Sequence, residues 1–554
     1  MRSVETVLAL VVLAVVVATF AGRLRIPAPS LLVLAGVAVG LVPGVPVVAL
    51  DPAAVSLVVL PPLLYAASTD LALGELRAVL RPVVVLAVGL VAASAVAVAV
   101  TVHLVSPQVP LAAGFVLGAA LASTDPVAVS ALARELDLPP RLLALVQGES
   151  LLNDASSLVL FQVSVAVAAA GTGVQLLPAA GQFVRLAGGG VLVGLVLAVL
   201  AGQVRRRSQD PVLETAVAVL TPYAVYVAAQ TVSASGVTAV VVAGLYLGDR
   251  GLRLSSGRSR LQIATVYSVL VFLLESVVFA VIGLELPALV RRLPAGEDAF
   301  LPSALAVFAV LVLTRVLWVY PVAYLPGRLR GLFRRRGTGG LPLAAGGTRF
   351  ELPWQVPAVV SWAGTRGVVP LAAALSIPLV TRSGAAFPHR DLLLVLATGC
   401  IVATLVVQGL TLGPLVRRLG VAQDSRTGHQ QEALARHAAV TAALVRLEEL
   451  TDVDAVPRIV AERLQRELSA RLERTRQHLD AVEQHSGDAT GAASHPDGDF
   501  VDSSSMAYRH VRQDLLATET ARLLELRDEG QISEAVRRRV QRLLDVEETG
   551  LAPE

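Results

Sequence analysis

The sequence predicts an all-α, polytopic membrane protein that ends in a helical tail. Of its 554 residues, 55% are hydrophobic, and the mean hydropathy of +0.68 is too high for an ordinary soluble domain. The apolar stretches consist mainly of Leu, Val and Ala, and aromatic residues make up only 4% of the chain. This composition favours membrane-spanning helices of about 20 residues over the short alternating strands of a transmembrane barrel.

About thirteen apolar runs are long enough to be transmembrane helices. They cover residues 4–21, 28–43, 53–69, 82–104, 110–133, 140–170, 180–203, 211–230, 235–248, 262–290, 303–325, 355–380 and 391–416. The runs at 28–43 and 235–248 are short, so one of them could be a re-entrant segment rather than a full span.

The arginines between these runs predict how the chain crosses the membrane, which we expect to be the cell membrane. The chain contains no Lys, and arginines cluster in the loops after odd-numbered runs, as at 205–207 and 334–336, whereas most of the alternate loops contain none. By the positive-inside rule, the N-terminus lies outside and the C-terminal tail lies in the cytoplasm. A cleaved signal peptide over residues 1–22 is the alternative, but only Arg2 precedes that apolar run, while Arg23 and Arg25 follow it.

The composition changes near residue 420, which divides the chain into a transmembrane domain, residues 1–420, and a cytoplasmic tail, residues 421–554. The tail is rich in charged residues, Ala and Leu with a helical period, and a Gly, Ser and Asp-rich connector interrupts it near 485–505. Acidic and basic residues are interleaved there, which indicates solvated helix faces rather than a nucleic-acid surface. We therefore expect a regulatory tail and no nucleic-acid partner.

The most unusual segment is "QGESLLNDASSLVLF", residues 147–161, which places polar residues inside an apolar run. Helical spacing puts Ser150 and Asp154 on one face, and Glu149 with Asn153, the only Asn of the chain, on the next. An ionisable side chain at the bilayer centre costs at least about 2.5 to 3.5 kcal/mol, so such residues are functional candidates by default. The candidates in other runs are Asp125, Glu275, Arg315 and Arg366.

Two of the apolar runs contain helix-breaking residues. In "STDPVAV", Pro126 disfavours a helical conformation at Asp125 and leaves main-chain carbonyls free to bind a cation. In "WAGTRGVVP", glycines and Pro370 flank Arg366. These are the fifth and twelfth runs, the middle members of two groups of three, and matching interruptions in two halves are typical of inverted-repeat transporters with the binding site between them. We expect two broken helices that cross at the site.

Five segments resemble, in order, signatures of the monovalent cation:proton antiporters, in the branch that bacterial sodium/proton antiporters share with animal sodium/proton exchangers. They are "STDPVAVSALAREL", "GESLLNDASSLVLF", "ESVVFAVIGLELP", "GTRGVVPLAAALSIP" and "VATLVVQGLTLGPLV". The tail is also similar to that of bacterial members. One departure is "LPPLLYAAST", where Ala66 and Ala67 stand in a region that carries an extra acidic residue in some archaeal members. Thr365 and Pro370, which lie near Arg366, are a second departure from the family pattern.

The resemblance implies a set of roles for the polar residues. Asp154 would bind the cation and the proton in turn, with Ser150 and groups at Thr124 and Asp125 completing the cation site. The transported Na⁺ would thus contact Asp154, Ser150 and Thr124, with Asn153 as a further candidate. Glu149 would form a structural ion pair with Arg366. A homodimer is implied by the resemblance alone. Glu275 and Arg315 are secondary candidates, which could pair with each other or serve only in packing.

The expected activity is the exchange of a monovalent cation, with Na⁺ favoured, for H⁺. A carboxylate removed from water can hold either a proton or a cation, and competition for the same oxygens is the basis of antiport. If the site opens to each side in turn, one ion gradient drives the other. Because Asn153 does not ionise, only one exchangeable carboxylate remains, and the resemblance then implies electroneutral exchange.

The same residues are compatible with alternatives to Na⁺/H⁺ exchange. Transport of K⁺ or Li⁺ on the same fold is the nearest. An organic-anion transporter could use Arg366 to hold a substrate carboxylate, but it leaves Asn153 and Asp154 without a role. A sensor that binds ions without moving them is a third possibility. An enzyme is least favoured, because no cluster of Cys and His has metal-binding spacing, and we expect no cofactor. Besides the ions, the predicted partner is membrane lipid.

Overall fold

The computed structural model describes most of the chain. The described residues are 11–17, 19–21, 27–43, 55–71, 73–125, 140–170, 176–208, 210–293, 300–333, 354–381, 384–420, 425–453, 455–484 and 504–551. They form two compact units, the first made of residues 1–209, 213–254 and 265–422, and the second of residues 210–212, 255–264 and 423–554. The predicted all-α class is confirmed, since the described residues outside helices contain only one isolated bridge, between Val380 and Ala386.

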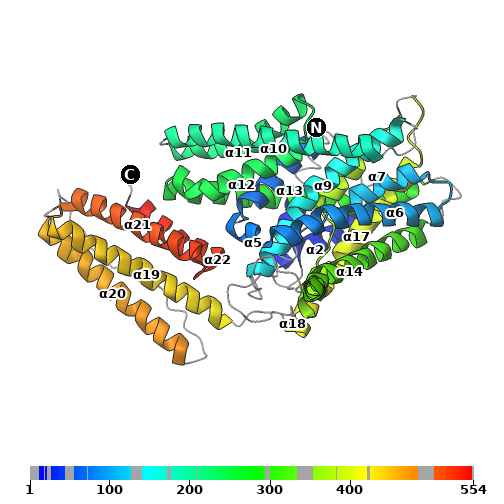
Figure 1. The fold of residues 1–554 in the computed structure, drawn as a ribbon. Coiled ribbons are helices and arrows are strands. Elements are labelled where there is room, and N and C mark those ends of the chain that lie inside the picture. Colours follow the sequence, from blue (N-terminus) through cyan, green and yellow to red (C-terminus); the bar gives the residue numbers. More distant parts are fainter. Residues whose placement is uncertain are drawn as a thin grey trace. The chain divides into compact units, whose positions relative to one another are not determined.

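Most of the predicted membrane helices are present, several with longer bounds (Figure 1). The helices of this region are α2 (Ala28–Gly40), α4 (Leu60–Thr69), α5 (Leu73–Val84), α6 (Val91–Val105), α7 (Leu111–Leu121), α9 (Pro140–Ala170), α10 (Leu176–Arg207), α11 (Pro211–Thr231), α12 (Gly236–Leu254), α13 (Gly257–Arg291), α14 (Phe300–Phe333), α15 (Gln355–Trp362), α16 (Val368–Leu375), α17 (Arg390–Ala403) and α18 (Gly409–Leu419). Three π-helical segments extend neighbouring helices: η1 (Val55–Val59), η2 (Val85–Leu90) and η3 (Thr404–Gln408).

Seven helical stretches of the described residues are long and apolar enough to cross a membrane. The protein is therefore a multi-pass membrane protein. Four shorter apolar helices accompany them, among them α2 and α7. The predicted total of thirteen spans is not tested, because the first and fifth predicted runs lie partly outside the described residues. The fifth run ends as an α-helix at Leu121, before the predicted interruption.

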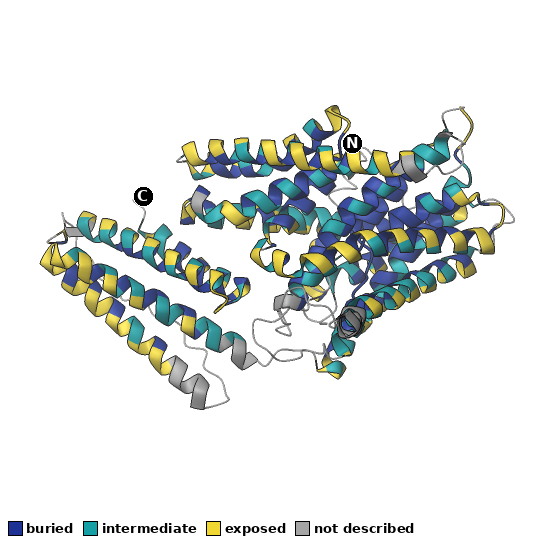
Figure 2. Ribbon diagram, viewed as in Figure 1, coloured by how far each residue is buried: buried dark blue, intermediate teal, exposed yellow. Residues whose placement is uncertain are grey.

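Burial differs between the helices in a way that separates a centre from a periphery (Figure 2). In the most apolar window of the α17 to α18 stretch, 72% of residues are buried, against 22% in the corresponding windows of α10 and α14. Leu192 on α10 and Leu317 on α14 are among the apolar side chains left exposed. Exposed apolar faces on helices of this length are what lipid contact requires.

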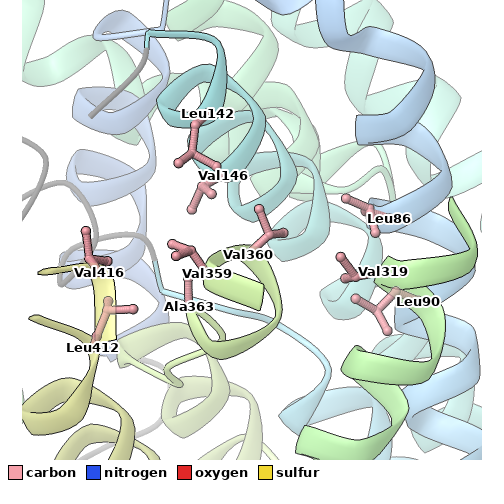
Figure 3. Close-up of a cluster of buried hydrophobic side chains, with 10 residues drawn as sticks. All are labelled: Leu86, Leu90, Leu142, Val146, Val319, Val359, Val360, Ala363, Leu412 and Val416. Atoms are coloured by element: carbon pink, nitrogen blue, oxygen red, sulfur yellow. The ribbon is translucent and has the colours of Figure 1, made fainter. Parts of the chain in front are cut away.

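The centre is close-packed through aliphatic and small residues. One cluster joins side chains from η2, α9, α14, α15 and α18 (Figure 3): Leu86, Leu90, Leu142, Val146, Val319, Val359, Val360, Ala363, Leu412 and Val416. Elsewhere α13 lies directly on α2, because a Cβ on Gly283 would stand 2.1 Å from the main-chain oxygen of Val33. Small residues at helix contacts are typical of membrane bundles, in which van der Waals packing holds helices together.

The second unit contains the tail helices α19 (Ser425–Asp452), α20 (Arg458–Gln484), α21 (Ser504–Asp528) and α22 (Glu534–Gly550). The predicted amphipathic tail helices are thus present, whereas the predicted connector near 485–505 lies almost entirely outside the described residues. Two apolar clusters form the interior, one around Leu464 and Leu515 and one around Leu523 and Leu544.

Candidate functional site

Helix α9 carries the predicted polar residues into the buried centre. Glu149 and Asn153 are 0% exposed, Ser150 is 1% exposed and Asp154 is 7% exposed. Because these side chains lie on two neighbouring faces of a 31-residue helix, they can contact groups on two different segments at once.

The chain just after α7 meets the segment between α15 and α16, whereas Pro126, on which the first predicted interruption rests, lies outside the described residues. Asp125 donates its main-chain N–H to the carbonyl of Thr365 at 2.8 Å, and the Thr365 hydroxyl donates to the carbonyl of Asp125 at 2.9 Å. Residues 123–125 after α7 and 363–367 between α15 and α16 are not helical. The paired hydrogen bonds satisfy main-chain groups that a broken helix would otherwise leave unpaired inside the membrane.

Opposite charges lie at the helix ends created by these breaks. Arg366 donates from Nη1 to the carbonyls of Ala122 and Ser123, at 2.9 and 2.6 Å, which places a positive charge at the C-terminus of α7. The Asp125 carboxylate lies against Gly367, the N-cap of α16, where a Cβ would fall 1.9 Å from Oδ2. Each charge opposes the partial charge of a helix end. Any side chain larger than that of Gly367 would displace the carboxylate.

Glu149 has a different partner from the predicted one. Arg315 on α14 donates from Nη1 and Nη2 to the two Glu149 carboxylate oxygens, both at 2.6 Å, and from Nε to the carbonyl of Val360 at 3.0 Å. The structure therefore replaces the predicted Glu149–Arg366 pair, and the suggested Glu275–Arg315 pair, with Glu149–Arg315. The reason is that the Arg366 guanidinium is directed to the carbonyls at the end of α7, while Arg315 reaches Glu149 in a bidentate geometry.

The predicted cation ligands converge beside this pair. The Ser150 hydroxyl donates to the carbonyl of Thr124, and the Ser123 hydroxyl donates to Oδ1 of Asp154. The Asn153 amide donates from Nδ2 to Oγ1 of Thr124 at 3.2 Å, while its Oδ1 is buried without a hydrogen-bond partner. A carboxylate, three hydroxyls, a main-chain carbonyl and an amide oxygen thus lie within one small region.

The other candidates have different places. Glu275 is half-buried on α13. Two residues near the site were not among the predicted ones: Ser123, and Thr404 in η3, whose Oγ1 accepts the Arg366 main-chain N–H at 3.1 Å. Ser123 could have been found because it directly precedes Thr124 in the "STDP" motif, whereas nothing local marks Thr404.

This geometry defines a class of protein. A buried carboxylate among oxygen ligands, where the chain after α7 meets the non-helical segment between α15 and α16, is typical of secondary ion transporters, in which main-chain carbonyls and helix ends bind the transported ion. The bundle provides a protein interior that tolerates irregular backbone at this depth.

Comparisons with known proteins agree with this class. The family described as "Sodium/hydrogen exchanger, transmembrane" matches residues 10–418. A Na⁺/H⁺ exchanger of Mycobacterium tuberculosis, named as uncharacterised, is 35% identical over 98% of this chain and 96% of its own. A sodium, potassium, lithium and rubidium/H⁺ antiporter of Bacillus pumilus is 31% identical over 75% of this chain and 62% of its own. The sodium proton antiporter MjNhaP1 of Methanocaldococcus jannaschii shares the fold, with a TM-score of 0.59 at 19% identity, over 76% of this chain and 99% of that one.

The chain belongs to the sodium/hydrogen exchanger family. It is therefore a secondary transporter of the monovalent cation/proton antiporter class rather than an enzyme.

Proposed function

We propose that the protein exchanges Na⁺ for H⁺ by alternating access at Asp154. The observation that carries this proposal is the position of Asp154, a buried carboxylate that accepts a hydrogen bond from Ser123 beside the Ser150 hydroxyl and the Thr124 carbonyl, which are hydrogen-bonded to each other. Glu149 is neutralised by Arg315, so it serves as a scaffold.

The ligand set supports one exchange site that is used in turn by the two ions. Asp154, Ser150 and the Thr124 carbonyl would bind the cation, and Asn153 has an unpartnered buried oxygen that could join them. The Asp125 carboxylate lies against Gly367 at the N-terminus of α16, so it would stabilise that helix end rather than carry the exchanged ions. Protonation of Asp154 removes the negative charge that holds the cation, so loading with one ion excludes the other.

Na⁺ is the proposed cation because the relatives are named for it, although the Bacillus pumilus relative is also named for potassium, lithium and rubidium. K⁺/H⁺ exchange is the alternative on the same site. An organic-anion transporter finds less support, because Arg366 already donates to the Ala122 and Ser123 carbonyls.

We propose electroneutral exchange of one cation for one proton. Asn153 cannot ionise, and Glu149 is paired, which leaves Asp154 as the exchangeable carboxylate of α9. Each cycle then moves no net charge.

Transport by purified protein in proteoliposomes tests both cation and stoichiometry. We expect external Na⁺ to raise internal pH, while K⁺ and Li⁺ added in turn measure selectivity. A potential of 100 mV imposed with valinomycin should leave the rate of Na⁺-driven exchange nearly unchanged, because such a potential supplies about 2.3 kcal/mol only for each elementary charge moved. A rate that follows the imposed potential would contradict one-for-one exchange and require a second proton-carrying group. Absence of exchange with every monovalent cation would contradict antiport.

We propose that the chain crosses the cell membrane with its N-terminus outside and its tail inside. The arginine distribution supports an extracellular N-terminus and a cytoplasmic tail in the cell membrane. Exposed apolar side chains such as Leu192 and Leu317 support direct contact with lipid. A homodimer is supported only by the family resemblance.

We also propose that the tail, residues 421–554, is a regulatory unit. Within the second unit, Arg260 near the start of α13 donates to the Asp545 carboxylate of α22 from Nε at 3.2 Å and also from Nη2, and it reaches Glu548 at 3.4 Å. Asp545 is 7% exposed, which makes this a partly buried pair rather than a surface one. Helix α13 continues from Arg260 into a predicted membrane span. A movement of the tail can therefore be passed along this helix to the transmembrane domain.

Arg260→Ala tests the tail proposal. We expect faster proteolysis of the tail and at least a twofold change in exchange rate, because Asp545 loses its charged partner. Arg258→Ala is the matched control, since Arg258 is exposed on the same turn. Exchanging the charges in Arg260→Asp with Asp545→Arg should restore both properties. An Arg260→Ala protein with a loosened tail and a wild-type rate would show that the tail does not regulate exchange.

A further inference from the structure

Thr365 holds the chain after α7 at two points. Its hydroxyl donates to the carbonyl of Asp125 at 2.9 Å, and its own carbonyl accepts the main-chain N–H of Asp125 at 2.8 Å. Thr365 is 1% exposed, so its hydroxyl is shielded from solvent. Residues 123–125 are not helical, and these two hydrogen bonds fix a part of the chain that does not continue α7 as a helix.

Arg366, the next residue, holds the same stretch a little earlier in the sequence. Its Nη1 donates to the carbonyls of Ala122 and Ser123, at 2.9 and 2.6 Å. Its main-chain N–H donates to Oγ1 of Thr404 in η3 at 3.1 Å, which ties the segment between α15 and α16 to the well-buried α17 to α18 stretch. The carbonyls of residues 122, 123 and 125 are thus all held from one anchored segment.

The carbonyl of Thr124 faces the other way. It accepts the hydroxyl of Ser150 on α9, and the Thr124 side chain accepts Nδ2 of Asn153 at 3.2 Å. This carbonyl and the N–H of Asp125 belong to the same planar peptide group. Because Thr365 holds that N–H on one side, the Thr124 carbonyl is directed to the opposite side, toward α9 and the proposed cation site.

A carbonyl that is already aimed at the ion binds it more tightly than one that must first be ordered. We propose that Thr365 is a positioning residue, which holds Asp125 at both main-chain groups, presents the Thr124 carbonyl to the transported cation and so sets the affinity of the exchange site. This inference rests on the proposed function, in which the Thr124 carbonyl is a cation ligand. Thr365 acts through the main chain of Asp125 and Thr124.

Only half of this two-point contact depends on which residue stands at position 365. Any residue there supplies the carbonyl that accepts the Asp125 N–H, whereas the second hydrogen bond needs a hydroxyl. Thr365 is also one of the departures from the family pattern that the sequence carries. A substitution can therefore remove one of the two hydrogen bonds, which leaves the peptide group free to pivot about the other.

Thr365→Val should raise the Na⁺ concentration for half-maximal exchange about tenfold, which corresponds to about 1.4 kcal/mol. The maximal rate should change by less than about twofold, because the variant loses cation binding rather than a later step. The measurement is the initial rate of Na⁺-driven internal alkalinisation in proteoliposomes over a series of Na⁺ concentrations at one pH. If K⁺ alone drives wild-type exchange, the same shift is expected for K⁺.

Three further variants separate this role from a general loss of packing. Thr365→Ser keeps the hydroxyl and should restore the wild-type Na⁺ dependence. Thr365→Ala removes the hydroxyl without adding an apolar group beside the Asp125 carbonyl, and it should behave as Thr365→Val does, so the test does not depend on the folding of one variant. Thr221→Val on α11 is the matched control, since Thr221 is 4% exposed and donates within its own helix, to the carbonyl of Val217 at 2.6 Å. It should leave both the rate and the Na⁺ dependence unchanged.

A second measurement does not depend on transport. Na⁺ that binds the folded protein raises its unfolding temperature, and the Na⁺ concentration needed for a given rise should increase by the same factor in Thr365→Val. The measurement uses full-length protein in detergent. A side chain that served packing alone would lower the unfolding temperature in the absence of Na⁺ and leave its Na⁺ dependence as in wild type.

The outcomes are distinct. Wild-type Na⁺ dependence of Thr365→Val in both measurements overturns the inference, and so does an equal change in Thr221→Val or a Thr365→Ser protein that stays impaired. A lower maximal rate at an unchanged half-maximal concentration also overturns it, because Thr365 would then act in a step after binding. The proposed function fails separately, if Asp154→Asn still exchanges ions. An unchanged Thr365→Val beside an inactive Asp154→Asn would remove the role of Thr365 and leave the proposed function standing.

Discussion

Asp154→Asn should reduce cation-driven proton movement to the rate of protein-free liposomes. The substitution keeps the shape of the side chain and still offers an oxygen to the Ser123 hydroxyl, but it removes the charge that binds the cation and the group that carries the proton. We expect the variant to elute from size exclusion as wild type and to unfold at a similar temperature in the absence of Na⁺. Na⁺ should no longer raise that temperature.

Ser157→Ala serves as the control for a buried polar substitution on the same helix. Exchange that persists in Asp154→Asn would place the carrier elsewhere, with Asp125 as the next candidate because it lies in the neighbouring segment after α7. Loss of exchange with retention of Na⁺-dependent stabilisation would mean that Asp154 carries the proton but is not needed to bind the cation.

Arg315→Ala should destabilise the protein by about 3 to 5 kcal/mol, because removing one partner of a buried pair leaves the other charge uncompensated. Glu149 is 0% exposed and Arg315 is 2% exposed, so water cannot replace the lost guanidinium. Thermal unfolding of purified protein measures the effect. Arg315→Lys should recover only part of the stability, since an ammonium group cannot reproduce the bidentate geometry.

Double variants decide which arginine pairs with Glu149. Adding Glu149→Gln to Arg315→Ala should restore part of the stability, because it removes the uncompensated charge, so the two effects will not add. In the Arg366→Ala background the same substitution should bring no rescue, since Arg366 interacts with main-chain carbonyls. Rescue with Arg366→Ala and additive losses with Arg315→Ala would instead favour the pair that the sequence predicted.

The residues of the site were predictable because their chemistry conflicts with their surroundings. Asp154, Glu149 and Arg366 stand in apolar runs where an ionisable group is costly, and the spacing of α9 fixes which of its polar residues share a face. The interruption around Arg366 was also predictable from its flanking glycines, and α15 does end at Trp362. These properties depend on residues that are close in sequence, so a single segment contains the information.

The sequence by itself determined the membrane class, most helix positions and the polar residues that form the site. The tertiary structure decided which of them meet. Arg315 and Arg366 are equivalent as isolated arginines in apolar runs, and only the tertiary fold brings Arg315 on α14 to Glu149 on α9 and leaves Arg366 for the end of α7. The hydrogen bond from Ser123 to Asp154 depends likewise on where α7 ends. Helix pairing is set by packing over the whole bundle, and one sequence records the groups available for contact but not the partner of each.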